Sequence, residues 1–141
     1  MQRQFDTLCQ LMRDPHPPVR VIAVEGVCRI LAHFWELIPS AVIMAMMKSL
    51  VNDSAHDAAS AAVRTSVFKG FTYILANQQH RSHSVLRAAL PQLANLIHDR
   101  SRSVRLAFCD LLLQVKAVKG IRFYKVALSA HLLTLFEQNP I

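Results

Sequence analysis

One turn-and-helix pattern recurs along this chain, and it restricts the possible folds more than any other feature of the sequence. It is clearest in residues 97–116, where Asp99 ends an apolar segment and Ser101 or Ser103 can cap the next helix. Apolar side chains then follow at the spacing of one helical face, at Val104, Ala107, Phe108, Leu111, Leu112 and Val115. These residues predict a turn that leads directly into an amphipathic helix.

Two earlier copies of the pattern precede this one. Each copy has a valine followed by an arginine near the start of a predicted helix, at Val19-Arg20, Val63-Arg64 and Val104-Arg105. Asp14 and Asp99 precede the valine at the same offset in the first and third copies, whereas the middle copy requires an insertion in its turn. The copies lie about 40 residues apart, which is the length of a two-helix repeat unit.

The composition favours helices throughout. Only three glycines occur, and hydrophobic residues make up 52% of the chain, which is enough for a packed core. Breakers between the apolar segments predict about seven helices. Prolines end the first helix near Pro15, open the third at Pro39 and kink the fifth at Pro91, and Gly120 closes the sixth. Residues 54–62 are alanine-rich and fit either an extended turn or a poorly buried start of the fourth helix.

We therefore predict an all-α fold of the HEAT/armadillo type, an α-α superhelix with three helix pairs and one further helix. The expected repeats span residues 4–36, 39–77 and 83–118, and residues 120–137 form the first helix of a fourth. A generic helical bundle is the alternative, and the recurring turn favours the array. Because no capping repeat is evident, we expect a piece of a longer solenoid.

The recurring arginines are predicted to be structural. A guanidinium that follows a buried valine in a turn can bond to the carboxylate or the carbonyls of the preceding turn. The set of structural turn residues comprises Asp14, Arg20, Arg64, Asp99 and Arg105.

Nothing in the sequence indicates catalysis, so we expect no catalytic residue and no cofactor. The pairs His56-Asp57 and His98-Asp99 resemble metal ligands of HD-type phosphohydrolases, but no further histidine lies one or two helical turns away, so no metal site is expected. The three separate cysteines fit buried, reduced thiols. No secretory signal and no apolar run of membrane-spanning length is evident.

The basic charge of the chain is concentrated in one segment. The formal net charge is +7, and residues 81–125 hold nine basic residues against two acidic ones. Such a segment favours a polyanionic partner, although a solvated basic surface is the alternative. The predicted contacts to DNA phosphates are Arg100, Arg102, Lys116, Lys119, Arg122 and Lys125.

The amino-acid sequence of the repeats, with their order and linkers, resembles that of the G-type HEAT subunit of condensin II. The resemblance covers about residues 8–135 and is carried by residues 26–30, 34–39, 63–69, 98–99, 104–119 and 123–125. It implies a non-catalytic regulatory or scaffold subunit of a chromosome-organising ATPase, located in the nucleus on chromosomes and active in mitotic chromosome condensation. The partners implied are the kleisin subunit, the SMC ATPase pair, the second HEAT subunit and DNA, with no membrane.

A second hypothesis belongs to a different class. The chain would then be a protein-binding adaptor of the transport-receptor or phosphatase-scaffold type, which binds an acidic peptide and has no role with DNA. Competition between duplex DNA and an acidic peptide separates the two hypotheses.

Overall fold

Three helical hairpins make up residues 2–77 and 80–117, the part of the chain described by the structure, which is a computed structural model. The hairpins pair α1 (Gln2–Leu11) with α2 (Pro17–Phe34), α3 (Ser40–Asn52) with α4 (Ala61–Asn77), and α5 (His80–Ala89) with α6 (Arg102–Ala117). These residues contain no strand. The prediction of an all-α solenoid is confirmed.

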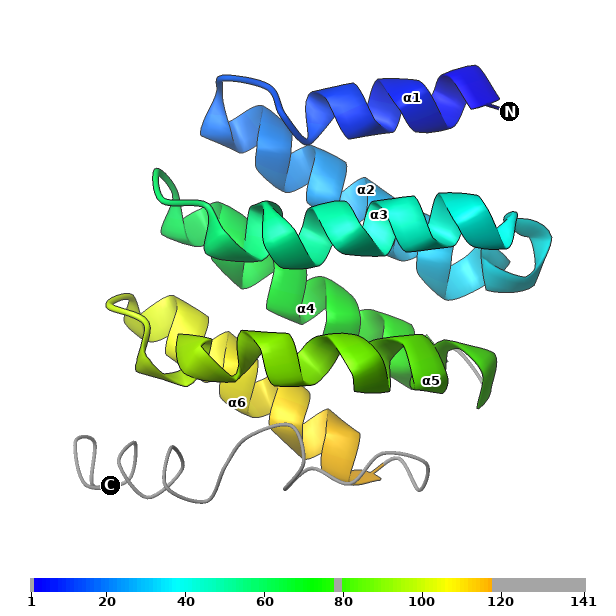
Figure 1. Cartoon of the computed structure of the whole chain (residues 1–141). Helices are drawn as coiled ribbons and strands as arrows, with labels where there is room; N and C mark the ends of the chain where they lie inside the picture. Colours follow the sequence, from blue (N-terminus) through cyan, green and yellow to red (C-terminus); the bar gives the residue numbers. More distant parts are fainter. Residues whose placement is uncertain (1, 78–79, 118–141) are drawn as a thin grey trace.

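The hairpins stack in two layers. Figure 1 shows α1, α3 and α5 side by side in one layer and α2, α4 and α6 in the other. In the second layer α2 packs along α4, and α4 packs along α6. The Phe68 and Phe108 rings meet edge to face there, with centroids 5.1 Å apart, and both side chains are fully buried. Each hairpin therefore covers the apolar face of its neighbour.

Prolines define the helix ends much as predicted. Pro17 and Pro18 occupy the first positions of α2, where a missing N–H costs no hydrogen bond, and Pro39 lies immediately before α3. The effect of Pro91 is larger than the predicted kink. The α-helix ends at Ala89, and Leu90–His98 forms the 3-10 helix η3, because proline cannot donate the bond that would continue α5.

Residues 54–60 form a turn rather than the start of a helix. They contain the short 3-10 helix η2 (Ser54–His56), and α4 begins at Ala61. Ser54 and Ala55 are nevertheless buried. Of the two alternatives left open for this segment, the structure therefore contains the extended turn.

Helices α2 and α4 are in close contact at Gly70. A Cβ atom at this position would overlap the Cys28 Sγ and would lie 2.8 Å from the Cys28 Cβ. Burial raises the pKa of the Cys28 thiol to about 12, and nearby Glu25 adds to this shift. Cys28 therefore remains a neutral packing residue near neutral pH.

Two parts of the prediction lie outside the described residues, namely the helix expected at 120–137 and the end of the third repeat. Among the residues that are described, no helix combines the length and the apolar character needed to cross a membrane.

Candidate nucleic-acid interface

The turns inside the three hairpins lie along the same edge of the solenoid. In Figure 1 the α1–α2, α3–α4 and α5–α6 connections all lie at the left of the molecule. This arrangement follows from the stacking, because every hairpin repeats the orientation of the one before it. Residues that occupy equivalent places in the turns are thereby brought close together.

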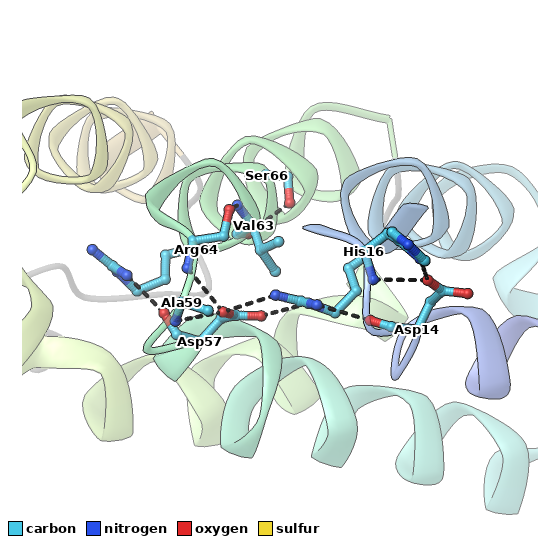
Figure 2. A network of polar contacts seen from close by, with 9 residues as sticks. Asp14, His16, Asp57, Ala59, Val63, Arg64 and Ser66 are labelled. Carbon is cyan, nitrogen blue, oxygen red and sulfur yellow. Dashed lines mark hydrogen bonds and ion pairs between the residues drawn. The ribbon is translucent and has the colours of Figure 1, made fainter. Parts of the chain in front are cut away.

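Arg20 connects the first turn with the second. Its Nε donates to Asp57 Oδ2 at 2.8 Å, its Nη2 donates to Asp57 Oδ1 at 3.3 Å, and its Nη1 donates to the Asp14 carbonyl at 2.8 Å. Figure 2 shows the contacts around Asp14 and Asp57. The bidentate carboxylate contact fixes the spacing of the two hairpins at their edge.

Arg64 repeats the arrangement between the second and third turns. Its Nε and Nη2 donate to the Asp99 carboxylate at 2.8 and 3.0 Å, and its Nη1 donates to the Asp57 carbonyl at 2.6 Å. Arg105 Nη1 donates to the carbonyls of Asp99 and Arg100 at 2.8 and 3.2 Å. We refer to Arg20, Asp57, Arg64 and Asp99 as the turn network.

The turn network differs from the sequence prediction in one respect. The expected partners were the carboxylate or the carbonyls of the preceding turn. Arg20 and Arg105 do bond to the carbonyls of Asp14 and Asp99. The carboxylate contacts of Arg20 and Arg64, however, reach the next turn. Asp57 accepts the hydrogen bond from Arg20. The prediction omitted Asp57 because of the insertion in the middle turn. The sequence did contain a signal for Asp57, because Asp57 precedes Arg64 at nearly the same spacing as Asp14 precedes Arg20.

The Asp99 carboxylate has a lowered pKa. Burial alone would raise the pKa of Asp99, but hydrogen bonds from the Arg64 side chain and the Ser101 backbone N–H, with the positive charges of Arg64 and Arg100, outweigh it. At Asp14 the pKa is lowered by the backbone N–H and the imidazole of His16. These contacts stabilise the charged forms of Asp14 and Asp99.

This shift predicts a loss of stability in acid. A carboxyl group whose pKa is lower in the folded than in the unfolded chain stabilises the fold fully above its ordinary pKa of 3.8, and this contribution disappears as the pH falls through the folded-state value. We expect the difference in free energy of unfolding between the parent chain and Asp99→Asn to shrink as the pH falls from about 6 to about 3. Urea unfolding at each pH measures it, and a constant difference would contradict the assignment.

Arg100 and Arg102 lie on the outer side of the third turn. Both are exposed, and neither forms an ion pair with another residue in the ranges 2–77 and 80–117. Asp99 is next to them in sequence, but its side chain is only 7% exposed and is directed at Arg64. The third turn therefore carries two exposed guanidinium groups, and the carboxylate next to them in sequence is hydrogen-bonded to Arg64.

The residues predicted to contact DNA phosphates do not all lie together among the described residues. Lys116 is exposed near the other end of α6, roughly 20 Å along the helix axis from Arg102. Lys119, Arg122 and Lys125 lie outside the described residues. Among the predicted contacts, the structure thus brings Arg100 and Arg102 together and separates Lys116 from them.

The two His-Asp pairs do not form a shared site. Asp57 bonds to Arg20, and Asp99 bonds to Arg64, while His56 Nδ1 lies 2.9 Å from the Val51 carbonyl. Within the described ranges, no three His, Cys, Asp or Glu side chains are arranged to hold a metal ion.

The stacked hairpins and the arginine–aspartate contacts between their turns define a HEAT-type solenoid, and the HEAT repeat family model matches residues 5–34. No solved structure matches the chain. The chain is 40% identical to condensin-2 complex subunit G2 of Homo sapiens and 43% identical to that of Danio rerio, over 99% of its length in each case. The Xenopus laevis subunit is 42% identical over 97% of the chain.

These matches confirm the predicted resemblance to the G-type HEAT subunit of condensin II. The chain spans 12% of the length of each of these relatives. The similarity therefore covers a short stretch of these relatives.

Proposed function

We propose that the chain is a segment of a non-catalytic scaffold subunit of condensin II, which acts in the nucleus on mitotic chromosomes. The similarity to the G2 subunits supports this proposal, as does a fold built from stacked hairpins that present an extended surface. The partners are the kleisin subunit, the SMC ATPase pair, the second HEAT subunit and DNA.

The DNA contact in this proposal rests on the outer side of the third turn. Arg100 and Arg102 are exposed there, and the adjacent carboxylate is engaged by Arg64. Guanidinium groups bind phosphate oxygens through charge-assisted hydrogen bonds, and such contacts give affinity without reading the base sequence. Lys116, Lys119, Arg122 and Lys125 extend the contact along the DNA backbone.

Reversing both charges in Arg100→Glu/Arg102→Glu is expected to weaken the binding of the full-length subunit to duplex DNA. Each lost phosphate contact reduces the slope of log affinity against log salt by about 0.9, so the slope should fall by about two. Fluorescence anisotropy with a labelled duplex over a salt series measures this slope. The loss should be the same for duplexes of different sequence.

Arg29→Glu/Lys69→Glu provides the matched control. It makes the same change in net charge on exposed residues of α2 and α4, away from the turn edge. We expect this variant to keep the parent salt slope. An equal reduction in both variants would mean that net charge, rather than the third turn, governs binding, and the DNA assignment would then be wrong.

A further inference from the structure

A groove of about 480 Å³ separates α3 from α5. It exists because the two layers pack differently. The second-layer helices are in extensive contact with one another, whereas α3 and α5 are not. Residues of both helices line the groove, among them Met44, Met47, Lys48, Val51, Val85 and Ala88.

Most of the side chains that line the groove are apolar. Met47 and Val51 are buried in the floor, while Met44 stands at the rim with 55% of its surface exposed. Ala88 on α5 leaves space opposite these side chains. Methionine side chains are flexible and polarizable, so a methionine-lined groove adapts to inserted apolar side chains of different shapes.

Among the described residues that line the groove, Lys48 is the one with an ionisable side chain. The sequences of α3, α5 and η3 contain no aspartate and no glutamate. The Lys48 ammonium group is the charge that the groove presents to a ligand. Charge complementarity therefore selects an acidic ligand, and the apolar lining selects one that also carries large apolar side chains.

We propose that this groove binds an acidic, amphipathic segment of a protein partner. The segment inserts apolar side chains between α3 and α5 and directs its carboxylates toward Lys48. DNA fits less well, because a polyanion without aliphatic side chains gains nothing from Met44 and Met47. This inference rests on the proposed function only because it requires a protein partner. It involves none of the residues that are proposed to contact DNA.

The test uses the full-length subunit and a short fluorescein-labelled helical peptide with leucines on one face and glutamates on the other. We expect this peptide to bind at least about tenfold more tightly than its counterpart with lysines in place of the glutamates. Ala88→Glu and Lys48→Glu should each weaken the binding of the acidic peptide by about tenfold or more. Ala62→Glu, at an exposed position of α4 outside the groove, should bind the peptide as the parent does.

Hydroxyl-radical footprinting gives a second readout in the parent protein, without any substitution. Bound peptide should protect Met44 from oxidation and leave Tyr73, which is exposed on α4, unchanged. The proposal is overturned if Ala88→Glu binds like the parent, or if Met44 is not protected. Arg100→Glu/Arg102→Glu should retain full peptide affinity, so a failure of the DNA assignment would leave this result intact. Displacement of the peptide by duplex DNA would also overturn the proposal of a separate site.

Discussion

Replacing Asp99 with alanine is expected to lower the free energy of unfolding by about 3–5 kcal/mol. The Asp99 and Arg64 side chains are only 7% and 10% exposed, and they share two hydrogen bonds at 2.8 and 3.0 Å. Alanine would leave the Arg64 guanidinium buried without its carboxylate and would also remove the acceptor for the Ser101 backbone N–H. A whole domain is stable by only about 5–15 kcal/mol, so this loss should be evident in urea unfolding.

Two further variants identify the cause of the loss. Asp14→Ala removes an aspartate from the equivalent place in the first turn, where its carboxylate bonds only to His16 among the described residues, so a smaller loss is expected. Arg64→Leu/Asp99→Leu removes both charges and should be more stable than Asp99→Ala, because no buried charge is left unpaired. If the double variant were as unstable as the single one, the loss would come from packing rather than from the ion pair.

The sequence predicted what depends on local pattern. The spacing of apolar residues in 97–116 gave α6 and its buried face, and the recurring valine–arginine pairs indicated the stacking of hairpins. Pro15 indicated the end of the first helix, and Pro39 indicated the start of α3. These features depend on neighbouring residues and on the requirement that apolar faces be buried, so they can be read without coordinates.

Features that depend on contacts between distant segments were not predicted. Arg20 and Asp57 lie in different hairpins, and nothing in the local sequence states that an arginine reaches the following turn. The methionines of residues 44–47 fitted either a core helix or a binding groove, and periodicity could not decide between them, because it does not show that α3 and α5 are apart. The sequence showed the basic segment, but it did not show which of its residues lie close together. Arg102 and Lys116 are separated by almost the whole length of α6.

Substituting Gly70 with alanine is expected to destabilise the chain by about 1–3 kcal/mol, against the usual preference of helices for alanine. The added Cβ would meet the Cys28 Sγ and, at 2.8 Å, the Cys28 Cβ. The Cys28 Cβ is bonded directly to the α2 backbone, so rotation of the side chain cannot move it away. Relief would require α2 and α4 to separate, which would loosen the buried contacts along both helices.

The same substitution at Gly26 should have the opposite effect. Gly26 is also inside a helix, but a Cβ there would have no heavy atom within 4 Å, so Gly26→Ala should stabilise the chain by about 0.5–1 kcal/mol. Cys28→Ala/Gly70→Ala should be less destabilised than the sum of its single variants, because the overlap with Sγ is then absent. Thermal or urea unfolding of the four variants measures these differences. Equal effects at Gly26 and Gly70 would show that helix propensity, and not the close approach of α2 and α4, determines the outcome.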